Sequence, residues 1–74
     1  TLANIKKGEL FRILSFLNIE KGLMDKLMIF GFAEGNEGMV RRIAPFGDPL
    51  EVTIEETSVS IRTEDASKIL VERI

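Results

Sequence analysis

Residues 41–52, RRIAPFGDPLEV, decide how this chain folds, because they place a stiff turn between two strand-like runs. Pro45 cannot donate a hydrogen bond within a sheet, so it is expected to end a strand or to lie on an edge. Gly47 can adopt a positive φ, and Asp48 can accept hydrogen bonds from nearby backbone amides. Pro49 keeps Asp48 out of the helical region and starts the next strand. These residues predict a wide hairpin loop.

The strand pattern is clearest directly after this turn. In residues 50–55, Leu50, Val52 and Ile54 alternate with polar residues, as in a strand with one buried face. A tight turn is expected at residues 55–57. Further strands are expected at residues 9–17, 39–46, 58–62 and 70–73. Val59 and Ile61 are expected to point inward.

The first of these strands, residues 9–17, carries apolar side chains at both odd and even positions, and therefore on both of its faces. Phe11, Ile13 and Leu17 share one side, whereas the other side carries Leu10, Leu14 and Phe16. A strand with apolar residues on both sides is typical of one that is covered on both faces. We therefore expect both faces of residues 9–17 to be buried.

Two helices are expected. In IEKGLMDKLMIFGF (residues 19–32), Leu23, Leu27 and Phe30 recur at i, i+4 and i+7, which predicts an amphipathic helix. Gly31 stands where a left-handed residue would end that helix. Thr63 is a good N-cap residue for a short second helix.

The predicted order is strand, helix, three strands, short helix and strand, within a single domain of residues 1–74. Several short strands with little helix predict a mainly β fold, a small, partly open β-barrel of about five strands. Closing the sheet is favourable because a flat sheet of short strands exposes its edges. An uncovered edge could pair with a second copy of the chain.

The composition excludes several functions. The chain has ten basic and twelve acidic residues, a formal charge of −2, no histidine and no cysteine. It therefore has no basic stripe for nucleic acid, and its Ser and Thr have no histidine to act as a base. Carboxylates alone, scattered over loops, do not form a transition-metal site. We expect no enzyme activity, no catalytic or metal-binding residues and no cofactor bound directly.

Location can also be predicted. Without cysteine the chain suits a reducing, cytoplasmic setting. The longest apolar run, residues 27–33, is too short to cross a bilayer, and no signal peptide is visible.

Three motifs together resemble the ferrous iron transport protein A family (FeoA-like domains). Its pattern has a Leu-x-x-x-Gly helix end followed by a second Gly, a Pro-x-Gly-Asp-Pro turn and an Arg-x-x-x-Ala-x-x-Ile-x-Val ending. The motifs fall on Leu27, Gly31 and Gly35, on Pro45, Gly47, Asp48 and Pro49, and on Arg62, Ala66, Ile69 and Val71. The resemblance covers essentially the whole chain. It departs from the family at residues 24–26, which are less basic, and at residues 55–60, which lack glycine.

The resemblance implies an SH3-like β-barrel with a short helix laid on it. It also implies a small cytosolic accessory or regulatory protein of bacterial or archaeal ferrous iron uptake, which docks on the GTP-binding part of a FeoB-like membrane permease. The partner would handle the iron, and the chain would be peripheral at the inner membrane through that partner, without inserting itself. The alternative is the SH3-like C-terminal domain of a metal-dependent transcriptional repressor, or a related paralogue.

Docking requires a surface. If the helix end and the proline turn lie side by side, they would form an apolar patch with a charged rim. The candidate partner-binding residues are Leu27, Phe30, Gly31, Phe32, Arg42, Pro45, Phe46, Gly47, Asp48 and Pro49. The competing interpretation places each phenylalanine in the core. Arg41 and Arg42 lie on an exposed strand face or reach the permease's nucleotide as an arginine finger.

Overall fold

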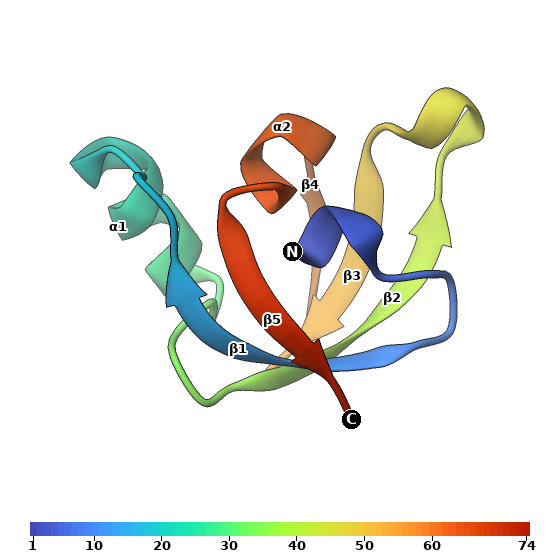
Figure 1. Ribbon diagram of the computed structural model, residues 1–74, viewed down its shortest axis with the longest axis horizontal. Coiled ribbons are helices and arrows are strands. Elements are labelled where there is room, and N and C mark those ends of the chain that lie inside the picture. The colour runs from blue at the N-terminus through green and yellow to red at the C-terminus, as the bar shows by residue number, and fades with distance from the viewer.

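The computed structural model describes residues 1–74 as one antiparallel sheet with two α-helices and two short 3-10 turns (Figure 1). The strand order is β4-β3-β2-β1-β5, so β4 and β5 are the two edges. The elements are η1 (Leu2–Asn4), β1 (Leu10–Phe16), α1 (Lys21–Ile29), β2 (Glu37–Ile43), η2 (Pro45–Gly47), β3 (Leu50–Ile54), β4 (Thr57–Ile61), α2 (Thr63–Ala66) and β5 (Ile69–Arg73). The predicted order of elements and the mainly β class are confirmed.

The sheet curls around one hydrophobic core, and η1 and α2 lie beside each other at one end of it (Figure 1). Leu2 of η1 and Ala66 of α2 are completely buried, so these two short elements plug that end. No polar or charged residue is buried. The core consists of Leu2, Ile5, Phe11, Ile13, Leu27, Phe32, Val40, Leu50, Val52, Ile54, Ile61, Ala66 and Ile69.

Strand β3 follows the alternation in its sequence. Leu50, Val52 and Ile54 are at most 2% exposed, while the residues between them are only partly buried. The turn between β3 and β4 has positive φ angles at both Glu55 and Glu56, which is typical of the type I′ turn that matches the twist of a hairpin.

Strand β1 departs from the prediction. Phe11 and Ile13 are buried as expected, but Leu17 is exposed and Phe16 packs against the core in its place. The cause is a register shift between Ile13 and Ser15 in the pairing with β5, because an extra residue reverses which side chains face inward. The expectation that both faces are covered is wrong: the outer face keeps exposed leucines at Leu10 and Leu14.

Strand β2 also has different ends from those expected. It begins at Glu37 and ends at Ile43, whereas residues 39–46 were predicted. It ends early because Pro45 has no amide hydrogen to donate and Phe46 has a φ of 73°. It begins early because Gly38 pairs with both β1 and β3.

Candidate partner-binding surfaces

The proline turn, residues 45–49, leaves the sheet as a compact projection. The Gly47 amide donates to the Ala44 carbonyl at 2.9 Å, and the Ala44 amide donates to the Pro49 carbonyl at 3.1 Å. Gly47 has a φ of 83°, and Asp48 is extended, with φ −151° and ψ 129°. The roles predicted for Pro45, Gly47 and Pro49 are therefore confirmed.

Asp48 accepts a backbone hydrogen bond, but from a distant part of the chain. Its Oδ1 lies 2.8 Å from the Thr63 amide nitrogen, and the Thr63 hydroxyl donates to the Gly47 carbonyl at 2.6 Å. Thr63 was predicted to be the N-cap of the second helix. The N-cap is Arg62, and Thr63 is the first helical residue. Asp48 thus satisfies a free amide at the start of α2 and fixes the turn to it.

Phe46 is the apolar side chain that the proline turn presents to solvent. It is 106% exposed, more than any other large apolar residue of the chain, and Pro45 and Pro49 beside it are exposed as well. Its φ of 73° places a bulky residue in the left-handed region, which costs about 1–2 kcal/mol. The fold therefore holds an aromatic ring outward without gaining burial from it.

The end of α1, unlike the proline turn, packs its leucine and phenylalanine side chains into or against the core. Gly31 has a φ of 99° and ends the helix region as predicted. Leu27 and Phe32 are core residues, 4% and 0% exposed, and Phe30 is half-buried against that core. The prediction that Leu27 and Phe32 lie on a docking surface is wrong, because their side chains complete the core under the helix.

The helix end and the proline turn also do not form one patch. A Cβ placed on Gly31 would lie 3.1 Å from the Cβ of Glu55, at the end of β3, whereas the proline turn precedes Leu50, at its start. A five-residue strand separates them, which corresponds to roughly 13 Å at about 3.3 Å per residue. Figure 1 shows α1 and η2 on opposite sides of the molecule.

The two arginines before the turn are both exposed. Arg42 Nη1 lies 3.4 Å from Glu51 Oε2 across the β2–β3 ladder, and Arg41 Nη1 lies 3.4 Å from the sulfur of Met39. Both thus fit the exposed strand face of the simpler interpretation. Their role toward a partner remains a prediction.

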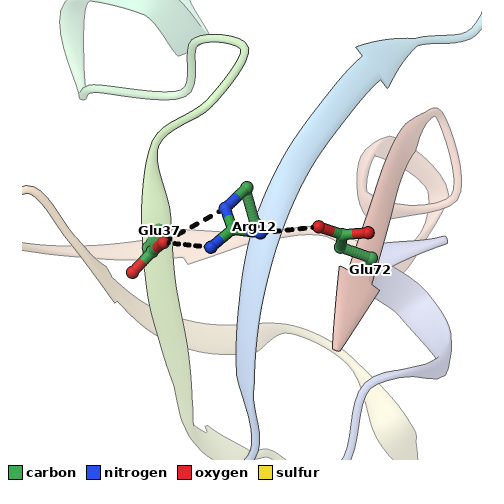
Figure 2. A network of polar contacts seen from close by, with 3 residues as sticks. All are labelled: Arg12, Glu37 and Glu72. Atoms are coloured by element: carbon green, nitrogen blue, oxygen red, sulfur yellow. Dashed lines mark hydrogen bonds and ion pairs between the residues drawn. The ribbon is translucent and has the colours of Figure 1, made fainter. Parts of the chain in front are cut away.

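A charged network on the outer face of the sheet was not predicted. Arg12 of β1 bridges Glu37 of β2 and Glu72 of β5, with N–O distances of 2.7 Å to each (Figure 2). The hydrogen bond to Glu37, followed by the one to Glu72, raises the pKa of Arg12 above its ordinary value. These residues are far apart in sequence, so only the strand register brings them together. All three side chains are at least 40% exposed, so the network adds little to stability.

Two further findings concern metals and membranes. The structure brings no three Asp or Glu side chains close enough together to hold a metal ion. None of its helices has the length and apolar character needed to span a membrane.

Solved structures share this fold. FeoA from Chlorobium tepidum is 30% identical, with a TM-score of 0.92, over 99% of this chain and 69% of that one. Iron(II) transport protein A from Clostridium thermocellum is also 30% identical with a TM-score of 0.92, over 99% of this chain and 44% of that one. Stenotrophomonas maltophilia FeoA, solved with zinc and described as a prokaryotic SH3 domain protein, is 23% identical with a TM-score of 0.83, over 97% and 88% of the two chains.

No curated protein matches the chain. The sequence profile of the FeoA domain matches residues 1–73. That match spans nearly the whole sequence and agrees with the SH3-like fold. The chain therefore belongs to the FeoA domain family, a family associated with ferrous iron transport.

Proposed function

We propose that this chain is an accessory subunit of ferrous iron uptake that docks, through its proline turn, on the cytosolic GTP-binding part of an iron permease. Family membership supports the link to ferrous iron transport. The observation that carries the docking surface is Phe46, a fully exposed ring on a turn that is tied to α2. An aromatic anchor surrounded by polar groups is typical of the centre of a small, specific interface.

The proline turn suits such a role because it is pre-shaped. Its two prolines fix two backbone angles, and the two hydrogen bonds from Thr63 hold it against α2. A partner that covers Phe46 therefore orders little of the chain, so little conformational entropy is lost on binding. Arg42 and Asp48, both exposed, would contribute charge at the rim.

In this proposal the chain is a cytosolic protein that acts by shape. It performs no chemistry, and the permease handles the iron. The proposal is narrower than the docking surface expected from the sequence. Leu27 and Phe32 are withdrawn because they are buried, and Phe30 and Gly31 because they lie away from the proline turn.

The test is binding to the purified GTP-binding domain of a FeoB-like permease from the same organism. Changing Phe46→Ser should weaken binding by at least roughly 30-fold, the effect expected when an interface loses an anchor residue. In an NMR titration of the isotope-labelled chain, shifts should centre on residues 45–49 and on Thr63.

The matched control is Ile29→Ser. Ile29 is 82% exposed at the end of α1, a helix on the opposite side of the molecule from η2 (Figure 1), so its loss should leave binding unchanged. Equal binding by the Phe46→Ser variant, or shifts confined to α1, would refute docking through the proline turn. Tight, stoichiometric Fe²⁺ binding by the isolated chain would refute the view that the partner alone handles iron.

The repressor alternative rests on fold alone. The manganese regulator SloR matches with a TM-score of 0.82 at 14% identity, over 100% of this chain and 34% of that one. The mass of the intact native protein distinguishes the two functions, because a repressor subunit would carry an additional DNA-binding domain.

A further inference from the structure

The two edges of the sheet are protected to very different degrees. Edge strand β5 carries Glu72 and Arg73 and has η1 beside it (Figure 1). Edge strand β4, residues 57–61 with sequence TSVSI, has no charge, no proline and no register shift. Proteins normally block a free edge with at least one of these features. Strand β4 is therefore available to pair with another strand.

The register of the β3–β4 hairpin shows which backbone groups are free. A two-residue turn at Glu55 and Glu56 makes its flanking residues a hydrogen-bonded pair, and such pairs alternate along an antiparallel ladder. The amides and carbonyls of Ser58 and Ser60 consequently point away from β3. No other backbone hydrogen bond in the structure uses residues 57–61, and both serines are exposed.

We infer that β4 pairs with β4 of a second copy of this chain, antiparallel, with a two-fold axis at Val59. In this register Ser58 of one copy exchanges backbone hydrogen bonds with Ser60 of the other, and the reverse. The same register brings Glu56 of each copy beside Arg62 of the other. Neither side chain makes an ion pair within the single chain, so both charges are free for a partner.

Charge selects this register over its neighbours. Shifting the axis to Ser60 would bring Glu56 toward the start of α2 of the other copy, where Glu64 and Asp65 lie, so Glu56 would meet acidic residues and no base. Shifting it to Ser58 would leave both Glu56 and Arg62 without an opposite charge. Only the axis at Val59 gives two symmetric pairs of opposite charge, and cross-strand charge pairs contribute to register even when exposed.

A groove beside β4 gives the second strand a place to pack. It lies between α1 and β4, and its lining is mixed: five apolar residues, Leu23, Leu27, Phe30, Val59 and Ile61, alternate with Lys26, Ser60, Arg62 and Asp65. Directly opposed residues of two paired strands point to the same face of the sheet. Val59 of the second copy would therefore lie on the face of the groove, against Val59 of the first. The pairing is independent of docking through the proline turn.

The first test is sedimentation of the chain and its charge variants across a range of concentrations. We expect a reversible dimer. Either single reversal, Glu56→Arg or Arg62→Glu, should raise its dissociation constant roughly tenfold, because two symmetric pairs become repulsive. The double reversal should restore it to within about twofold. As the matched control, Glu64→Arg should leave it unchanged.

The second test follows individual amides by hydrogen exchange. As concentration rises, the Ser58 and Ser60 amides should become protected, while Val59, which already bonds to β3, should change little. A chain that stays monomeric at millimolar concentration would overturn the inference. So would a dimer in which these two amides stay unprotected. A dimer that is strengthened by Glu64→Arg would overturn the register, because the axis at Val59 gives Glu64 no charged partner in the other copy.

Discussion

Two left-handed glycines in this chain, Gly31 and Gly47, have phenylalanine neighbours that differ in burial. Phe30, which precedes Gly31, packs partly against the core. Phe32 follows Gly31 at the end of α1 and is 0% exposed, whereas Phe46 precedes Gly47 in the proline turn and is 106% exposed. At the helix end the glycine turns the chain back, so that the next ring enters the core. In the proline turn the phenylalanine itself adopts the positive φ, and its ring points outward. The difference teaches that a neighbouring glycine does not by itself decide whether a phenylalanine is buried: the backbone conformation of the segment and its place relative to the sheet do.

The largest expected difference between the two regions comes from removing each ring in turn. Phe32→Ala should lower the free energy of unfolding by about 3–5 kcal/mol, since it leaves a cavity in a small core. Phe46→Ala should change it by less than about 0.5 kcal/mol, because nothing packs on that ring. Urea unfolding followed by circular dichroism measures both.

A chain of this size has little stability to lose, so the Phe32→Ala variant can unfold completely. Phe32→Leu, which keeps most of the volume, then replaces it and should cost about 1.5 kcal/mol or less. A cost at Phe46 equal to that at Phe32 would contradict the comparison, because it would show that both rings are structural.

Substituting the two glycines tests the same comparison with a smaller expected difference in stability. Both have positive φ, 99° at Gly31 and 83° at Gly47, so alanine is strained at each by about 1–2 kcal/mol. An added Cβ at Gly31 would also meet the Glu55 side chain at 3.1 Å, whereas one at Gly47 would meet nothing within 4 Å. Gly31→Ala should therefore cost about 2–3 kcal/mol in urea unfolding, and Gly47→Ala about 1 kcal/mol less. Equal losses would mean that Glu55 moves aside freely.

Much of this fold could be predicted because local chemistry fixes it. The alternation over residues 50–54, the glycine after α1 and the proline that ends β2 each restrict the backbone without reference to distant residues. The existence and order of the elements depend on such restrictions.

The arrangement of the candidate site could not be predicted in the same way. The separation of Phe46 from Phe32 depends on the length and direction of β3. The reversal of faces in β1 depends on a register shift against β5. The tie from Asp48 to Thr63 and the network around Arg12 each join residues from separate elements. All of these depend on strand register, and a single sequence does not reveal it.

Each of the two turns is also held by a side-chain hydrogen bond. Removing these two hydrogen bonds should cost amounts of stability that differ less than the costs of the phenylalanine or glycine substitutions. Asn36 Nδ2 donates to the Gly31 carbonyl at 2.7 Å in a partly buried place, while Asp48 accepts from the Thr63 amide at the surface. Asn36→Ala should cost about 1–1.5 kcal/mol, because it removes the shorter of the two hydrogen bonds that the partly buried Gly31 carbonyl accepts, the other coming from the Ala33 amide. Asp48→Ala should cost about 0.5–1 kcal/mol, since water can replace part of an exposed cap. Thermal unfolding of both variants measures the difference, and a reversed order would contradict the burial argument.

The smallest expected change in stability lies at a third turn, before β1. There, as at Asp48, a carboxylate accepts a hydrogen bond from a backbone amide. Glu9 Oε1 accepts from the Lys6 amide at 2.7 Å, and its Oε2 lies 3.3 Å from Arg73 Nη1. The hydrogen bond from Lys6 is the main cause that lowers the pKa of Glu9, with Arg73 acting in the same direction against desolvation. A lowered folded-state pKa stabilises the fold above the pKa of the unfolded chain, and this contribution is lost as pH falls through the folded-state value. The melting temperature of the unmodified chain should therefore exceed that of Glu9→Gln at neutral pH, and the two should converge in acid. A gap that widens in acid would mean that the neutral carboxyl is the better partner for Lys6, which contradicts the direction of the shift.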